Sequence, residues 1–126
     1  MAINFDKSIG LHSAALLLRE QRSSLLASNI ANGDTPGFKA KDIDFKQALQ
    51  QVTQAIKSDS SYQSNNPLSN DLIKYRIPNQ PDTGDGNSVD VQQEKMEFAR
   101  NAMDYQVVLG LLDSRVKGMI RALRGE

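Results

Sequence analysis

Cysteine is absent from this chain of 126 residues, and histidine occurs only once. Without cysteine there can be no disulfide bond, no thiolate metal site and no thiol nucleophile. Fifteen basic residues are balanced by fifteen acidic ones, so the chain lacks the surplus of positive charge with which proteins bind nucleic acid or anionic membranes. We therefore expect no nucleic-acid partner, and the neutral balance leaves little repulsion between copies of the chain.

Long apolar segments are also missing. The longest unbroken apolar run extends from Ala14 to Leu18, which is far too short to cross a bilayer. Residues 1–6 lack the basic start and the apolar core of a cleaved secretory signal, so export from the cytoplasm would need another route. A chain of this length suits one compact domain.

Residues that could carry out chemistry are few. His12 has no orienting partner in the sequence, and a lone histidine of this kind is usually a surface or interface residue. The segment from Asp82 to Asn87 resembles a calcium loop, but its spacing lacks the third-position ligand and the final glutamate of an EF-hand. Asp44 is better explained as a helix cap, and Asp42 as a residue among neighbouring lysines, than as a carboxylate pair. We therefore expect no catalytic, cofactor-binding or metal-binding residue, no cofactor and no small-molecule substrate.

The first segment, residues 1–33, is predicted to form an N-terminal helix over about residues 4–32. Leucine recurs every seven residues, at Leu11, Leu18 and Leu25, which is the spacing of a helix that packs along one face. We expect Gly33 to end this helix in the left-handed conformation. The turn that follows needs a positive φ at its second corner, and Gly37 supplies it.

Residues 34–88 form a mixed connector. Asp44 is expected to cap a short helix, with the side chain of Gln47 reaching back as in a capping box. Residues 58–70 are rich in Ser, Asn and Gln and predict a mobile loop. Residues 75–77, which a proline follows, predict a short strand. The apolar face of the short helix comprises Phe45, Ala48, Leu49, Val52 and Ile56.

The last segment, residues 89–126, carries the longest periodic pattern. Asp90 fits the N-cap position, with Gln93 as its capping-box partner. Apolar side chains then recur at steps of three and four residues, and the helix that they predict would be roughly 50 Å long. Such a rod is typical of coiled-coil assemblies rather than of a small globular domain. The predicted seam on this helix consists of Phe98, Ala102, Tyr105, Leu109, Leu112, Val116, Met119 and Leu123.

The two terminal helices decide the expected architecture. Each carries an apolar stripe that cannot stay in water, and folding the ends of the chain back on each other buries part of both. We therefore predict a mainly α fold in which long N- and C-terminal helices pair as a coiled coil, with a small looped and β middle region. One pair of helices leaves outward residues uncovered, so the stripes are also predicted to be an assembly seam. The residues expected to face outward are Leu16, Leu26, Val108 and Ile120.

The segment from Leu26 to Lys39 is specific enough to indicate a family. Its sequence, LASNIANGDTPGFK, resembles the N-terminal signature of the bacterial flagellar rod and hook proteins. Residues 40–45, 75–78 and 86–90 are similar to one branch of that family, the basal-body rod proteins of the proximal rod. The motif residues are Ser28, Asn29, Ile30, Ala31, Asn32, Thr35, Pro36, Gly37 and Phe38.

The resemblance implies a structural subunit of the flagellar rod and no enzymatic activity. Such subunits polymerise into a hollow drive shaft that crosses the periplasm and transmits torque for motility. The implied partners are copies of the chain itself, other rod proteins, the adaptor at the inner-membrane MS ring and the flagellar type III export apparatus. Export proceeds without a cleaved signal peptide. The terminal helices of residues 1–33 and 89–126 would form an inner coiled-coil layer, and residues 34–88 would pack outside it.

Other functions stay open at this point. Another axial protein of the flagellum, or an export-linked helical adaptor, would share the same pattern. A soluble adaptor or chaperone that binds an exported partner would be an ordered oligomer on its own, whereas a rod subunit would be a monomer with mobile ends. A hydrolase has no residues to nominate.

Overall fold

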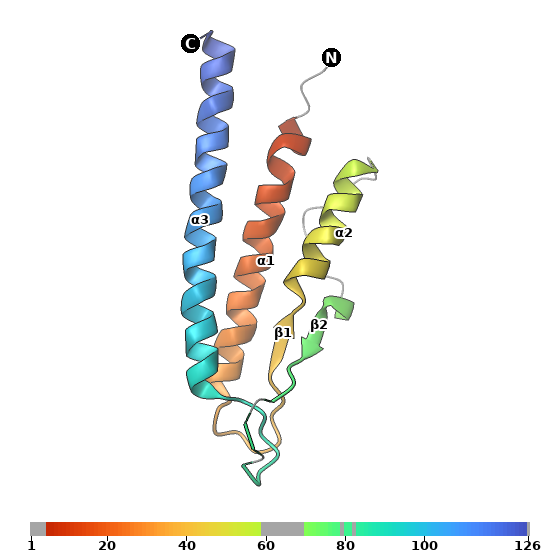
Figure 1. Cartoon of the computed structure of the whole chain (residues 1–126), viewed down its shortest axis with the longest axis vertical. Coiled ribbons are helices and arrows are strands. Elements are labelled where there is room, and N and C mark those ends of the chain that lie inside the picture. Colours follow the sequence, from red (N-terminus) through yellow and green to blue (C-terminus); the bar gives the residue numbers. More distant parts are fainter. Residues whose placement is uncertain (1–4, 59–69, 79, 82, 126) are drawn as a thin grey trace.

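The computed structural model describes residues 5–58, 70–78, 80–81 and 83–125 (Figure 1). The mobile loop predicted for residues 58–70 lies almost entirely outside the described residues. In chain order the elements are helix α1 (Phe5–Ala31), strand β1 (Lys41–Ile43), helix α2 (Phe45–Lys57), the 3-10 turn η1 (Asn70–Leu72), strand β2 (Ile73–Tyr75) and helix α3 (Val91–Arg124).

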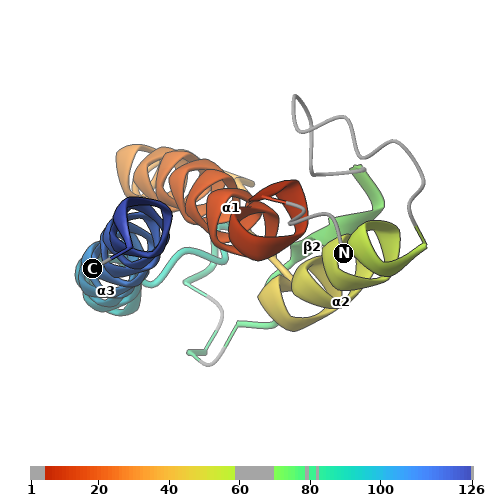
Figure 2. The ribbon, with the colours of Figure 1, turned by 90° about the horizontal axis from the view of Figure 1, so that it is seen from above.

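The two terminal helices form the long axis of the molecule. α1 and α3 run antiparallel and side by side, and their contact is the most extensive between any two elements (Figure 1). Seen from above, α2 lies on the opposite side of α1 from α3 (Figure 2). The predicted fold class, mainly α with paired terminal helices and a small β middle region, is confirmed. In the described part of the chain, no helix is long and apolar enough to span a membrane.

α3 begins and ends at defined caps. The carboxylate of Asp90 accepts hydrogen bonds from the backbone N–H groups of Gln92 and Gln93, which confirms the predicted N-cap. At the other end Gly125 has a φ of 74°, and its N–H bonds back to carbonyls of the last turn. The helix has 34 residues, which makes it about 50 Å long. Its C-terminal end therefore extends past the first described residues of α1 (Figure 1).

α2 has the predicted cap but not the predicted capping box. Asp44 Oδ1 accepts a hydrogen bond from the Gln47 N–H at 3.1 Å. The Gln47 side chain does not reach back, because its oxygen accepts a hydrogen bond from Lys74 Nζ at 3.0 Å. Lys74 also pairs with Asp44 Oδ2 at 3.1 Å, so a residue of β2 fastens the start of α2. The apolar face was predicted correctly, with Ala48 and Val52 buried.

The two strands pair antiparallel, with Ile43 opposite Ile73. The strand predicted at residues 75–77 was placed two residues too late, since β2 ends at Tyr75. The register follows burial: Ile43 is buried and lies opposite an apolar residue. The N–H of Arg76 still donates to the Ala40 carbonyl at 2.9 Å. The side chain of Arg76 bonds to two carboxylates, on β1 and α3. The regular pairing of the strands ends one residue earlier, at Tyr75.

The apolar core lies between α1 and α2, not between the two terminal helices. Leu18 is fully buried and packs with Ile43, Ala48 and Leu72. Around this cluster lie Leu25, Phe45 and Leu49. The leucine stripe predicted on the first helix therefore faces α2 and the strands at Leu18 and Leu25, while Leu11 is 38% exposed.

α1 ends differently from the prediction. Gly33 does not adopt the left-handed conformation, whereas Gly37 does, with a φ of 74°. The N–H of Gly33 donates to the Ile30 carbonyl at 3.2 Å and closes the helix. Gly33 matters for space, because a Cβ at this position would lie 2.5 Å from Cγ2 of Val91. The first residue of α3 thus packs directly on the end of α1.

Candidate functional site

A network of charged and polar side chains joins α1, the strands and the beginning of α3. Arg22 on α1 donates to both carboxylate oxygens of Asp42 on β1, from Nε at 2.9 Å and from Nη2 at 3.0 Å. The same Nη2 lies 2.9 Å from Oε2 of Glu97 on α3. Bidentate arginine–carboxylate pairs are strong and directional. One guanidinium therefore fixes three elements relative to one another.

A second arginine completes this network. Arg76, immediately after β2, contacts Asp42 and Glu94 through its two terminal nitrogens. The side chain of Glu94 is only 1% exposed, and a buried carboxylate is costly unless it is paired. Its other oxygen accepts a hydrogen bond from Asn29 Nδ2 at 3.0 Å. We call this network the polar joint, and it consists of Arg22, Asn29, Asp42, Arg76, Glu94 and Glu97.

Asn29 is the motif residue with the most extensive role in the joint. It is 1% exposed, and its side chain pairs with the backbone of Lys41 on β1. Nδ2 donates to the Lys41 carbonyl at 2.8 Å, and Oδ1 accepts from the Lys41 N–H at 3.1 Å. An amide side chain has the same donor and acceptor as a peptide group. Asn29 therefore bonds to the strand as a neighbouring strand would, and it holds β1 against α1.

A second polar layer lies further along the two helices. Asn101 on α3 is fully buried, and its Nδ2 donates to the Arg19 carbonyl and to Ser23 Oγ, both at 2.8 Å. Arg19 in turn pairs with Asp104 at 3.1 Å, and its guanidinium lies 3.8 Å from the centre of the Phe45 ring. The α1–α3 contact is thus polar along the N-terminal part of α3. Hydrogen bonds there fix how the two helices align.

Asp42 gives the joint a dependence on acid. Burial by itself raises the pKa of the Asp42 carboxyl, but hydrogen bonds and the positive charge of Arg22, together with a hydrogen bond from Arg76, outweigh burial and lower the pKa below its ordinary value of 3.8. As the pH falls, the Asp42 carboxyl therefore binds a proton more readily in the unfolded chain than in the folded chain. The free energy of unfolding falls as protons are added.

We expect the stabilisation by Asp42 to be fully present at neutral pH, and to be lost as the pH falls from about 3.8 through the lower pKa of the folded protein. Urea unfolding of the wild type and of Asp42→Asn at a series of pH values measures this. The variant should be the less stable protein at pH 7, and the difference should shrink in acid. A difference that stays constant down to pH 3 would contradict the assignment.

Asn87 organises the turn between α1 and β1. Its Nδ2 donates to the carbonyls of Asn32 at 2.9 Å, Gly33 at 3.0 Å and Thr35 at 2.9 Å. Its Oδ1 accepts from the Val89 N–H at 2.7 Å, and the residue is 6% exposed. These three carbonyls belong to the turn that follows α1, which ends at Ala31. A side chain from the connector before α3 therefore holds the turn that leads from α1 to β1.

Replacing Asn87 by aspartate should lower the free energy of unfolding by about 1–3 kcal/mol. The variant loses the amide N–H donor and turns a carboxylate towards three carbonyl oxygens. Urea unfolding followed by circular dichroism would measure the loss. Gln92→Glu is the matched control, since it makes the same change of amide to acid at an exposed position in the first turn of α3. A negative charge there should be neutral or slightly stabilising. Equal stability of the two variants would rule out this role for Asn87.

The other motif residues build the same turn. Asn32 Nδ2 donates to the Ser28 carbonyl at 2.8 Å, and its Oδ1 accepts from Thr35 Oγ1 at 3.1 Å. The Gly37 N–H donates to the Asp85 carbonyl at 2.8 Å, which ties the turn to the connector before α3. The half-buried motif residues are Ile30, Asn32 and Phe38, and the exposed ones are Ser28, Ala31, Thr35, Pro36 and Gly37.

The predicted seam divides between two surfaces, because Leu18 and Leu25 of α1 pack on α2 and the strands, whereas the seam residues of α3 lie along one side of that helix. The buried residues of α3 are Glu94 and Asn101, which meet polar groups of α1. Leu26, which was expected to face outward, is fully buried, whereas Ile120 is 42% exposed, and Leu16 and Val108 are half-buried. Of the seam on α3, Tyr105, Leu112 and Met119 are half-buried, and Phe98, Ala102, Leu109, Val116 and Leu123 are exposed.

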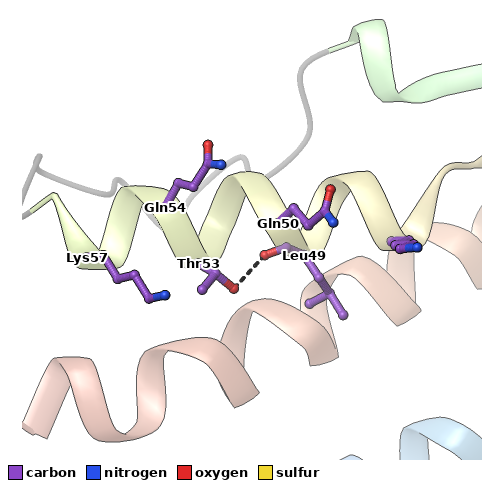
Figure 3. Close-up of a pocket in the computed structure, with 6 residues that line it drawn as sticks. Leu49, Gln50, Thr53, Gln54 and Lys57 are labelled. Atoms are coloured by element: carbon purple, nitrogen blue, oxygen red, sulfur yellow. Dashed lines mark hydrogen bonds between the residues drawn. The ribbon is translucent and has the colours of Figure 1, made fainter.

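The surface hollows of the described residues do not suggest a binding pocket. One hollow, on α2, is lined by side chains of that single helix (Figure 3). Thr53 Oγ1 donates to the Leu49 carbonyl at 2.7 Å, so the hydroxyl serves its own helix. Asp82 of the loop once compared with a calcium site lies outside the described residues. Asp85 in that loop accepts hydrogen bonds from Thr83 Oγ1 and the Asn87 N–H, so it closes a turn.

Comparisons with known proteins match the sequence of this chain to one family. Residues 11–39 match the family described as flagella basal body rod protein, and this range contains the motif at the end of α1. The chain is 50% identical to a flagellar basal body rod protein FlgB of Aeromonas hydrophila, over 131 aligned positions that cover 100% of this chain and 99% of the relative. FlgB of Escherichia coli K12 is 39% identical, with 98% of both chains covered. The chain belongs to the flagellar basal body rod proteins.

This membership decides between the functions considered for the sequence. As a flagellar basal body rod protein of the FlgB type, the chain is a structural subunit of the proximal rod and not an enzyme. Its place is the rod of the flagellar basal body. FlgB of Cereibacter sphaeroides is 40% identical, and the alignment covers 97% of this chain and 98% of the relative. The predicted family, function and location are therefore confirmed.

Sequence reasoning missed several residues that position the helices of this rod protein. Asp42 was interpreted only as a residue among neighbouring lysines, and its structural role was missed: two arginines from other elements bind it. Arg76 was noted only as part of a predicted strand and of the family resemblance, and Glu94 and Asn101 were not identified. A usable signal was present, since polar residues recur on α3 at steps of three and four at positions 94, 97, 101 and 104.

Proposed function

We propose that this rod protein assembles with copies of itself and with other flagellar rod proteins through the exposed apolar side of α3. The observation that carries the proposal is the exposure of large apolar side chains along a helix that is capped at both ends. Leu109 is 41% exposed and Leu123 is 71% exposed. Isolated apolar residues are normal on a surface, whereas a continuous series of them marks an interaction site. Of the predicted seam, Leu11 and the exposed residues of α3 remain the proposed contact surface, whereas Leu18 and Leu25 pack inside the chain.

Transmission of torque fits the way in which the helices are fixed. Arg22 bonds to β1 and to α3 at the same time, so α1 cannot slide along α3 without breaking charged contacts. Asn101 fixes the same register further along the helices. A subunit that carries load needs such a rigid register. The proposed assembly is a hollow shaft across the periplasm, with residues 1–33 and 89–126 in its inner layer and residues 34–88 outside.

The proposed partners include the adaptor at the inner-membrane MS ring and the flagellar type III export apparatus, which would export the chain without cleaving a signal peptide.

Isolated basal bodies provide the test. A strain that lacks the gene would be complemented with the tagged full-length chain, and purified basal bodies would be probed for the tag. We expect the chain to copurify with other rod proteins and with the MS ring, and motility to be restored. In a strain without a working type III export apparatus, the chain should accumulate in the cytoplasm. Absence of the chain from basal bodies of motile cells would refute the proposal.

A further inference from the structure

α3 carries two separate stripes of exposed apolar side chains. Members of the second stripe, such as Met103 and Val107, are 65% and 61% exposed, and none of them belongs to the predicted seam. The front stripe consists of Phe98, Leu109, Val116, Ile120 and Leu123. The back stripe consists of Met96, Met103, Val107 and Leu111.

The two stripes lie on opposite flanks of the α1–α3 pair. Asn101 marks the direction of α1, because it bonds to Arg19 and Ser23. Each residue of an α-helix is rotated by about 100° from the one before. Counted from Asn101, the front stripe lies roughly 40–100° around the helix in one direction, and the back stripe roughly 80–160° in the other. The side of α3 opposite α1 separates the two stripes with polar residues, namely Lys95, Gln106, Asp113 and Lys117.

Two exposed charges distinguish the flanks. Seen from one end, the chains of two antiparallel helices turn in opposite senses. The residue that comes directly after a contact residue therefore points to the same flank of the pair on both helices. Glu20 follows Arg19 and therefore shares the flank of the front stripe. Arg100 precedes Asn101 and therefore lies on the flank of the back stripe. Both side chains are exposed, and neither forms an ion pair in the described part of the chain.

Glu20 and Arg100 also lie at the same height along the helix pair. Arg19 contacts Asn101, and Arg22 contacts Glu97. These contacts place Glu20 level with the turn of α3 that contains Arg100. One flank therefore presents a carboxylate beside an apolar stripe, and the other presents a guanidinium beside an apolar stripe at the same level.

We propose that a second copy of this chain covers the back stripe with its own front stripe, so that Glu20 of one copy meets Arg100 of the next. This inference rests on the proposed function and names the surface on each side of the contact. A back-to-back pair would bring two Arg100 side chains together, and a front-to-front pair would bring two Glu20 side chains together. Only the front-to-back arrangement pairs opposite charges. It is heterologous, so each added copy leaves a stripe open for the next one, as a polymer requires.

The absence of cysteine makes this arrangement testable by cross-linking. Three full-length variants would be expressed in cells that lack the native chain: Val116→Cys on the front stripe, Val107→Cys on the back stripe, and the double variant. Purified basal bodies would be treated with a flexible bismaleimide. We expect a ladder of dimers and higher species from the double variant and only monomers from each single variant. Val116→Cys combined with Gln106→Cys, on the polar side of α3, is the matched control and should give no ladder.

Each outcome separates this inference from the proposed function. Dimers from either single variant would show an isologous pair and would overturn the inference, as would a double variant that is present in basal bodies without cross-links. Absence of the wild-type chain from basal bodies would instead refute the proposed function. A second measurement uses charge: Glu20→Arg and Arg100→Glu should each lower incorporation by up to about fivefold, and the double exchange should restore it. Failure of the double exchange to restore incorporation would also count against the contact.

Discussion

Leu109→Asp is expected to abolish rod assembly and motility while export of the chain continues. Leu109 lies near the middle of α3, in both the predicted seam and the front stripe, and it is 41% exposed in the single chain. The substitution should therefore change the folding stability of the single chain only slightly. In an apolar contact with a neighbouring subunit, an unpaired carboxylate would cost several kcal/mol at each copy. Because every subunit repeats the contact, the penalty accumulates along the polymer.

Gln106→Asp is the control for this experiment, because Gln106 is exposed on the polar side of the same helix, less than one turn away. It should support normal swimming. The readouts are a motility assay, detection of the chain outside the cytoplasm and detection in purified basal bodies. If both variants behave alike, the assignment of the helix faces is wrong. Normal swimming of Leu109→Asp cells would show that this side of α3 does not form an essential contact.

Arg76→Met should lower the free energy of unfolding by about 3–5 kcal/mol, the usual cost of removing one partner from a buried charge network. The change leaves Glu94, whose side chain is 1% exposed, with only the amide of Asn29 as a partner. Asp42 keeps Arg22. Urea unfolding of the purified full-length chain, followed by circular dichroism at neutral pH, would measure the loss.

Lys74→Met provides the matched control two positions earlier in the chain. The pair between Lys74 and Asp44 is exposed, with side-chain exposures of 55% and 38%, so its removal should cost no more than about 1 kcal/mol. A loss below about 1 kcal/mol for Arg76→Met as well would mean that the polar joint adds little to stability. In that case the joint would act only in setting the register of the helices.

The α1–α3 contact explains why the seam was only partly predictable. A hydrophobic pattern assigns apolar residues to the inside, and on α3 this pattern selects Leu109 and its neighbours. The polar residues at positions 94, 97, 101 and 104 repeat with the same spacing, so periodicity alone could not show which series faces α1. Arg19 and Arg22 of α1 determine that the polar series faces α1, because their charges need partners and acidic residues of α3 supply them.

The motif at the end of α1 was also only partly predictable from the sequence. Its sequence was enough to indicate the family, and its glycine at position 37 has the predicted positive φ. The role of Asn29 could not be predicted, since its partners Lys41 and Glu94 lie 12 and 65 residues away. Asn87, which holds the same turn, is 55 residues from the carbonyl of Asn32 that it binds.

The sequence by itself determined the local features of this rod protein. Both long helices, the caps at Asp44 and Asp90 and the turn at Gly37 were predictable, because each depends on interactions within a few residues of the chain. The tertiary structure alone decided which faces meet: the leucines of α1 pack on α2, and the polar joint fills the contact with α3. The physical reason is that a charged side chain takes its place from its partner, and here the partners come from segments far apart in the chain.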